Sequence, residues 1–258
     1  MSVWVREAVT IPLMGGAYLR GDFGFVGQPG LFTVLCVHGF GSHRGGEKVQ
    51  AIEQECQRIG WTFASFDFRG HGQSSGTMTD LRGSGLLSDL SAIQTWLFGR
   101  GVRKLYLFGS SMGGWASSWF ANRHPEIVSA VVLLAPAFQF LHARWSRLTV
   151  EQQEEWKRTG KMRFTSDWVD AELSYDLVAE REQFPVETLF REWKTPTLIF
   201  HGMNDDVVRP ASSIHFIEQV QYQLVELRLI RDGDHRLTAH KQEIARETLR
   251  FYQRAELL

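Results

Sequence analysis

Residues 105–115 read Leu105-Tyr106-Leu107-Phe108-Gly109-Ser110-Ser111-Met112-Gly113-Gly114-Trp115. An apolar run that stops at a glycine is typical of a strand, and residues 112–124 have the spacing of a helix. A strand, a turn and a helix around the pattern G-x-S-x-G place the serine in a strained turn with its hydroxyl free to react. Ser111 is therefore the candidate nucleophile, since Gly109 and Gly113 flank it where a Cβ would collide with neighbouring backbone. Ser110 has no glycines in the corresponding positions.

The pattern G-x-S-x-G is weak evidence alone, because an ordinary glycine-rich turn can have the same sequence. The rest of the chain provides the context. Apolar runs of strand length at 31–37, 61–68, 128–135, 196–200 and 225–230 alternate with helical spacing at 47–59, 86–98, 211–220 and 237–254. This alternation predicts an α/β fold with a mostly parallel, doubly wound sheet. Residues 3–11 and 14–21 predict two antiparallel strands leading into it, followed by a turn at Gly21-Asp22-Phe23-Gly24.

The alternation is interrupted at residues 137–194. A capping box at 149–152 predicts a helix that ends near Gly160, and residues 170–182 resemble a second helix. An excursion of this length between two strands is too long for a plain crossover. We therefore predict one domain over residues 1–258, with a small lid inserted at 137–194.

The composition favours a protein that acts on small molecules. Lys and Arg number 28 against 29 Asp and Glu, without blocks of one sign, so the sequence suggests no nucleic-acid partner. Cys36 and Cys56 lie in apolar segments and are interpreted as buried thiols. The N-terminus does not resemble a secretion signal and no run reaches the length of a membrane span, so we expect a cytoplasmic protein without membrane insertion.

A serine hydroxyl attacks a carbonyl only when a base accepts its proton and a carboxylate orients that base. Sites in parallel sheets form at the carboxyl ends of strands, which directs attention to the residues that follow each strand. Asp205 and Asp206 follow the strand at 196–200, and His235 follows the strand at 225–230. The chain order serine, acid, histidine is the order expected when a strand, elbow and helix carry the serine.

The segment His38-Gly39-Phe40-Gly41 follows the strand at 31–37. A tetrahedral intermediate needs two donors for its oxyanion, and we predict the backbone N–H groups of Phe40 and Met112. His38 is expected to be structural. A metal site built from His38, His43, His71 and His201 is disfavoured by the spacing, and the glycines at 70–72 do not complete a dinucleotide-binding pattern. We predict neither a metal nor a cofactor.

Together these segments resemble the landmarks of α/β-hydrolase-fold serine hydrolases over essentially the whole chain. In that family the acid follows the His-Gly pair by three residues, which implies Asp205, and the loop Arg69-Gly70-His71-Gly72 is a structural turn. Cinnamoyl-type carboxylesterases and small acyl-glucuronide and acyl-thioester hydrolases are the most similar members. Dehalogenases of this fold carry an aspartate at the position of Ser111, so they are set aside.

The resemblance implies a serine carboxylester hydrolase with Ser111, Asp205 and His235 as its triad and a small acyl ester as substrate. Aromatic residues gather in the predicted lid, which favours short-to-medium or aryl acyl groups. The alternatives are an acyl-thioesterase, a lipase-like acylglycerol hydrolase, and a slow ligand receptor on the same fold. We predict substrate contacts from Phe40, Ser110, Trp115, Phe138, Trp145 and Val207.

Overall fold

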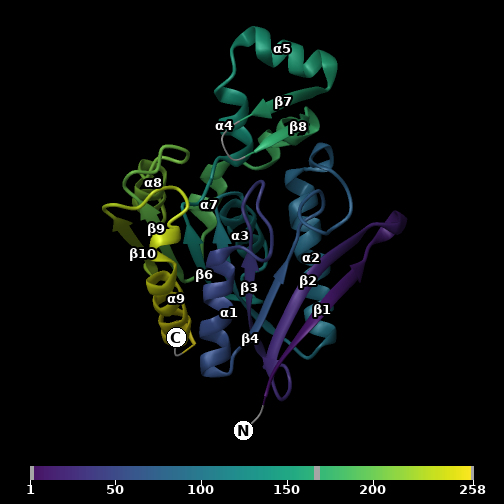
Figure 1. Ribbon diagram of the computed structural model, residues 1–258. Coiled ribbons are helices and arrows are strands. Elements are labelled where there is room, and N and C mark those ends of the chain that lie inside the picture. The colour runs from purple at the N-terminus through teal and green to yellow at the C-terminus, as the bar shows by residue number, and fades with distance from the viewer. Residues whose placement is uncertain (1–2, 166–168, 257–258) are drawn as a thin grey trace.

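A mixed sheet forms the centre of the computed structural model, which describes residues 3–165 and 169–256 (Figure 1). In order across the sheet, the strands are β1 (Trp4–Pro12), β2 (Tyr18–Val26), β4 (Thr62–Phe66), β3 (Phe32–Val37), β5 (Lys104–Ser110), β6 (Val128–Leu134), β9 (Thr197–Gly202) and β10 (Val225–Ile230). β2 pairs antiparallel with β1 and β4, whereas every other neighbouring pair in this sheet is parallel. The predicted α/β fold with a mostly parallel sheet is confirmed.

The side chains of β3 show why helices cover both faces of the sheet. Val34 and Cys36 belong to one buried apolar cluster, and Leu35 and Val37 belong to another. Successive side chains of a strand point to opposite faces, so an uninterrupted apolar strand needs cover on both. The covering helices are α1 (Glu47–Ile59) and α9 (Lys241–Ala255) on the Val34 side, and α2 (Gly83–Gly99), α3 (Met112–Arg123) and α8 (Ala211–Gln219) on the Leu35 side.

The N-terminal hairpin differs from its prediction. A 3-10 turn occupies Met14–Gly16, and β2 continues through Gly21 and Gly24, where we expected the chain to turn. A Cβ on Gly21 would lie 2.1 Å from the Phe66 ring, and a Cβ on Gly24 would lie 2.3 Å from the Trp4 ring. Glycine in a strand can mark a close approach as well as a turn. These two glycines leave room for aromatic rings.

Most of the inserted segment lies above the sheet in Figure 1, at the edge where the parallel strands end, whereas residues 186–192 lie beside the sheet, next to α3 and α8. Its elements are α4 (Phe140–Ser146), α5 (Val150–Thr159), β7 (Lys161–Thr165), β8 (Asp170–Ser174), α6 (Asp176–Ala179) and α7 (Val186–Glu192). The capping box predicted at the start of α5 is present, with Thr149 accepting from the Gln152 N–H. We refer to residues 137–194 as the lid.

The helix predicted at 170–182 is wrong for most of its length. Residues 170–174 form β8, which pairs antiparallel with β7, and only Asp176–Ala179 is α-helical. Ala171 and Leu173 are buried and alternate with exposed Asp170 and Glu172, the period of a strand with one covered face. The hydrophobic spacing over this short segment was compatible with both structures.

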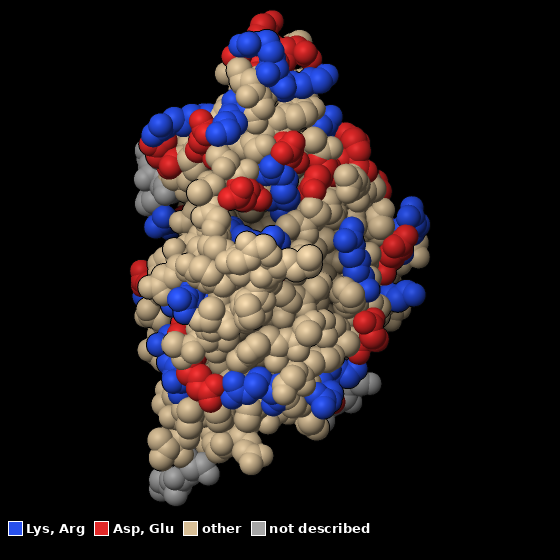
Figure 2. Space-filling view, turned by 90° about the vertical axis from the view of Figure 1, so that its right-hand side faces the viewer, with Lys and Arg blue, Asp and Glu red and all other residues tan. Residues whose placement is uncertain are grey.

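Three further 3-10 helices complete the described elements, at Met78–Asp80, Arg181–Gln183 and Thr238–His240. Among the described residues, no helix combines the length and the hydropathy needed to cross a bilayer. Cys36 and Cys56 are buried free thiols, as predicted. On the face in Figure 2, acidic and basic side chains are intermixed around a broad area of uncharged residues.

Candidate active site

Ser111 occupies a strained turn between β5 and α3. Its φ of 52° and ψ of −114° lie outside the regions that most non-glycine residues adopt. A Cβ on Gly113 would lie 2.1 Å from the Val37 carbonyl oxygen, and a Cβ on Gly109 would lie 2.5 Å from Ser117 Oγ. Both flanking glycines are therefore required sterically. The Ser111 N–H donates to the Leu134 carbonyl at 2.9 Å, which ties the turn to β6.

The structure brings Ser111, His235 and Asp205 into one hydrogen-bonded row. His235 Nε2 lies 3.1 Å from Ser111 Oγ, and His235 Nδ1 lies 2.8 Å from Asp205 Oδ2. An ionised carboxylate only accepts hydrogen bonds, so Nδ1 carries the proton and Nε2 is left to accept one from the serine. These residues are separated by 124 and 30 positions in sequence. The arrangement has the geometry of a nucleophile, a base and an orienting acid.

Asp205 is held as a carboxylate by its neighbours. Its Oδ1 accepts from the N–H groups of Val207 and Val208 at 2.9 and 2.8 Å, and His201 Nε2 lies 3.2 Å from its Oδ2. Burial raises the pKa of Asp205, but hydrogen bonds from His201, His235 and Val208 outweigh burial and hold it well below its usual value. Asp206, by contrast, is exposed.

Two glycines bring together the loop after β9, which carries Asp205 and which we call the acid loop, and the loop after β10, which carries His235. Gly202 ends β9 and packs against the backbone of Gly233, so that a Cβ on Gly202 would lie 2.3 Å from the Gly233 carbonyl oxygen. The Asn204 N–H also donates to the Gly233 carbonyl at 2.9 Å. This backbone contact brings His235 within reach of Asp205.

The predicted oxyanion donors lie beside the serine. Met112 is the first residue of α3, where a backbone N–H has no partner within the helix. Phe40 follows Gly39, and a Cβ on Gly39 would lie 3.5 Å from the Ser111 Cβ. Within residues 3–165 and 169–256, neither the Phe40 nor the Met112 N–H donates to another residue. Their role as oxyanion donors stays a prediction.

Three of the predicted substrate contacts lie within packed aromatic clusters. Trp115 is 1% exposed and lies edge-on to Phe184. Phe138 is stacked on Phe216 with ring centroids 4.4 Å apart. Trp145 packs against other aromatic residues of the lid, Trp156 and Tyr175. Of these three, Trp115 and Phe138 are buried side chains, and a contact with substrate stays a prediction for all three.

The other predicted contacts are Phe40, Ser110 and Val207. The Phe40 side chain is half-buried, and Val207 is 39% exposed. Arg147 donates to the Val207 carbonyl at 2.9 Å, which links the lid to the acid loop. The Ser110 hydroxyl lies 3.2 Å from Lys48 Nζ, a contact that the sequence analysis did not anticipate. Substrate binding by these residues likewise stays a prediction.

Arg144 of α4 is a further residue near the site that the sequence did not indicate. Its guanidinium carbon lies 4.1 Å from the centroid of the Phe40 ring and 5.1 Å from that of Phe140. Burial, followed by repulsion from Arg147, lowers the pKa of Arg144 to about 10. This cation–π contact connects the lid to the loop that carries one predicted oxyanion donor. Nothing in the spacing of residues 40 and 144 indicated it.

The histidines considered for a metal site have other partners. The ring of His38 contacts the Gly39 carbonyl through Nδ1 and accepts the Phe68 N–H through Nε2. Burial, with repulsion from His71, lowers the pKa of His38 to about 3, so it is a neutral structural residue. In the described part of the chain, no three His, Cys, Asp or Glu side chains are arranged to hold a metal ion.

Comparison with known proteins identifies the family of the chain. The family model described as "Serine aminopeptidase, S33" matches residues 31–160 and 173–242. The chain is 28% identical over 208 residues to the palmitoyl-protein thioesterase ABHD10 of Bos taurus, a mitochondrial protein, covering 79% of this chain and 67% of that protein.

Solved structures are similar over nearly the whole chain. A putative hydrolase from Agrobacterium vitis S4 has a TM-score of 0.83 at 24% identity, covering 96% of this chain and 98% of that one. Mouse alpha/beta hydrolase domain-containing protein 10 has a TM-score of 0.80 at 23% identity, with 96% and 99% covered. Est1E from Butyrivibrio proteoclasticus with bound ferulic acid has a TM-score of 0.79 at 21% identity, with 97% and 100% covered. At these identities the likeness shows a shared fold.

Proposed function

Because this chain belongs to the hydrolase family described as "Serine aminopeptidase, S33", we propose that it hydrolyses acyl esters through an acyl-enzyme formed on Ser111. The chain is an α/β hydrolase. The geometry of the site residues supports the proposed reaction through an acyl-enzyme. The observation that carries it is the row of hydrogen bonds from Ser111 Oγ through His235 to Asp205, at 3.1 and 2.8 Å.

In the acylation step, His235 Nε2 takes the proton of Ser111 as its Oγ bonds to the substrate carbonyl carbon. The carbonyl oxygen becomes an oxyanion, and the N–H groups of Phe40 and Met112 stabilise it. The intermediate collapses when the carbon–oxygen or carbon–sulfur bond to the leaving group breaks, and His235 gives its proton to that group. Water then attacks the acyl-enzyme, with His235 again serving first as base and then as acid.

Asp205 orients His235 and stabilises the positive charge that His235 carries in both transition states. His201 contacts the Asp205 carboxylate and so helps to hold it in place. Its Nδ1 lies 2.7 Å from Ser213 Oγ and its Nε2 lies 2.8 Å from the Val208 carbonyl, so the ring is held on two sides. We assign His201 as a positioning residue for Asp205.

The proposed substrates are short-to-medium or aryl acyl esters. The lid contributes a dense group of aromatic side chains, and an apolar cover of this kind selects acyl groups by their volume. A structural neighbour crystallised with ferulic acid, an aryl acid, is consistent with an aryl preference.

Acyl thioesters are the second candidate, because relatives that match over 79% of this chain are named palmitoyl-protein thioesterases. The same triad cleaves both classes of substrate, since thiolates leave at least as readily as alkoxides. The triad alone therefore does not select between an ester and a thioester.

The direct test uses p-nitrophenyl butyrate and rapid mixing. We expect a burst of p-nitrophenol that matches the enzyme concentration, and intact mass spectrometry of quenched enzyme should show a butyryl adduct on Ser111. Ser111→Ala should abolish both the burst and the adduct, whereas Ser88→Ala, at an exposed serine of α2, should retain both. Undiminished turnover in Ser111→Ala would refute the proposal.

A further inference from the structure

We propose that Lys48 is a positioning residue that holds the loop carrying His235 against the turn carrying Ser111. The inference rests on the proposed function, because it gives these two loops a common task. Lys48 lies in the first turn of α1 and is part of neither loop.

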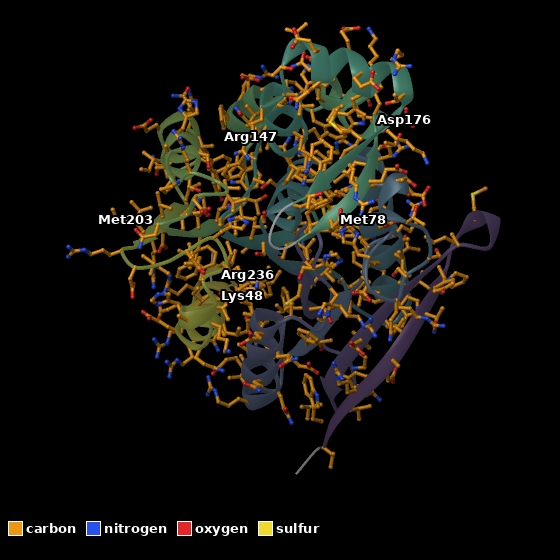
Figure 3. The ribbon with its side chains drawn as sticks, turned by 45° about the horizontal axis from the view of Figure 1, so that its top comes forward. Lys48, Met78, Arg147, Asp176, Met203 and Arg236 are labelled. Carbon is orange, nitrogen blue, oxygen red and sulfur yellow. The ribbon has the colours of Figure 1, made fainter. Side chains whose placement is uncertain are left out.

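The ammonium of Lys48 bridges the two loops directly. Its Nζ donates to Ser110 Oγ at 3.2 Å and to the Arg236 carbonyl oxygen at 2.6 Å. Ser110 immediately precedes the nucleophile, and Arg236 immediately follows the base. Figure 3 shows Lys48 beside Arg236 at the C-terminal edge of the sheet. One side chain therefore contacts the neighbours of both reacting groups.

The loop of residues 231–237 is also tied to the strand that precedes Asp205. The Leu237 N–H donates to Asp234 within the loop at 2.7 Å, and Gly233 packs on Gly202 of the acid strand. These contacts fix the loop relative to Asp205. The Lys48 bridge fixes it relative to Ser111, and a displacement of about 1 Å between reacting groups can cost about a hundredfold in rate.

The surroundings of Lys48 are unusual for a surface cation. Among the residues that the structure describes, no carboxylate lies within ion-pair distance of its Nζ; the contacts are a hydroxyl and a carbonyl. Burial lowers the pKa of Lys48 to about 8, against attraction by Asp234 and with repulsion from Arg236. A partly buried ammonium without an ion pair costs stability, and the two hydrogen bonds to the loops offset part of that cost.

Lys48→Met tests the proposal, since methionine keeps an unbranched side chain that is one heavy atom shorter and removes the three donors. We expect kcat for p-nitrophenyl butyrate to fall about 10- to 100-fold with KM within about twofold of wild type, because Lys48 itself is not among the predicted substrate contacts. The Tm should stay within about 4 °C of wild type, which separates this loss from unfolding. Lys48→Arg retains donors and should recover part of the loss.

The matched control is Lys241→Met. Lys241 pairs with Glu47, next to Lys48, and joins α1 to α9; among the described residues its ammonium forms no ion pair with either loop. It should leave kcat unchanged. Ser110→Ala removes one acceptor of the bridge, and its effect should be smaller when Lys48 is already methionine. Additive losses in the double variant would contradict the bridge.

A structural readout separates this proposal from the proposed function. Crystal structures of Lys48→Met and Lys241→Met should show the Ser111 Oγ to His235 Nε2 distance longer than 3.1 Å in the first and unchanged in the second. An unchanged distance in Lys48→Met, or a rise in KM alone, would overturn the positioning role. If wild type forms no acyl-enzyme but the distance still lengthens, the proposed function fails while the positioning role stands.

Discussion

Asp205 and Asp206 are adjacent in sequence, yet their surroundings differ completely. Asp205 accepts hydrogen bonds from His235 and from the N–H groups of Val207 and Val208, whereas Asp206 is exposed. The first carboxylate is thus held ionised beside the base. The second has no contact with His235 among the residues described.

We predict that Asp205→Asn lowers kcat by about three to four orders of magnitude, because an amide no longer enforces the tautomer with Nε2 free. Asp206→Asn should change kcat by less than about twofold, since an exposed polar substitution has little effect. Steady-state kinetics with one p-nitrophenyl ester measure both. If Asp206→Asn proved the more damaging change, the acid role would pass to Asp206.

We predict that titration of Lys48 raises the free energy of unfolding as the pH rises above about 8. Burial lowers its pKa from 10.5 to about 8, with Asp234 and Asp205 opposing and Arg236 adding to the effect. Below pH 8 the folded state carries the full cost of the buried charge. Between about pH 8 and 10.5 the unfolded chain binds a proton that the folded chain has lost, so the free energy of unfolding rises with pH through this group. The expected gain is about 2 to 3 kcal/mol.

Urea unfolding of wild type and Lys48→Met at about pH 7 and about pH 10.5 isolates this effect. Burial also raises the pKa of Cys36 and Tyr252, which lowers stability in alkali, but both variants share that loss. The difference between the two proteins should therefore shift in favour of wild type as pH rises. A difference independent of pH would show that the Lys48 ammonium titrates normally.

Among the elements, β2 depends on glycine for the packing of its neighbours. The Phe66 ring lies over Gly21 in the paired strand and itself packs edge-on against Trp96 of α2, with centroids 6.0 Å apart. A methyl group at position 21 would push the ring into the tryptophan. Overpacking of this kind costs about 1 to 3 kcal/mol.

We predict that Gly21→Ala lowers Tm by about 3 to 10 °C. Gly99→Ala is the matched control: it lies at the end of α2 with no atom within 4 Å of the added Cβ, and alanine favours helix by up to about 1 kcal/mol. Differential scanning calorimetry should show no loss of Tm in the control. Equal effects of the two substitutions would mean that the Phe66 ring moves aside without cost.

For the whole molecule, we expect substrate choice to depend on the inserted segment of fewer than sixty residues that we call the lid. We predict that kcat/KM is greatest for short-to-medium or aryl acyl groups and declines gradually, because a methylene contributes about 1 to 3 kcal/mol in an apolar pocket. A series of p-nitrophenyl esters from acetyl to palmitoyl, with a feruloyl ester and an S-acyl thioester alongside, measures the profile. A maximum at palmitoyl would instead place this chain with its long-chain thioesterase relatives.

The sequence alone predicted the features that depend mainly on interactions between residues close together in the chain. Gly109 marks the Ser111 turn because its steric conflicts, with Ser117 and Gly113, arise within a few residues of it. The uninterrupted apolar run of β3 predicted a sheet covered on both faces. The capping box predicted the start of α5. The order of serine, acid and histidine followed from the alternation of strands and helices, with the resemblance selecting Asp205.

Tertiary structure was needed wherever distant segments meet. The local sequence around Gly21 and Gly24 is compatible with both a turn and a strand. Only the rings of Phe66 and Trp4, which pack on these glycines, show that the segment is a strand. β8 forms because β7 offers it a partner, which its own short pattern could not reveal. Lys48 contacts residues 62 and 188 positions away. Contacts over such separations leave no periodic signal in the chain, since they depend on how the completed sheet brings its loops together.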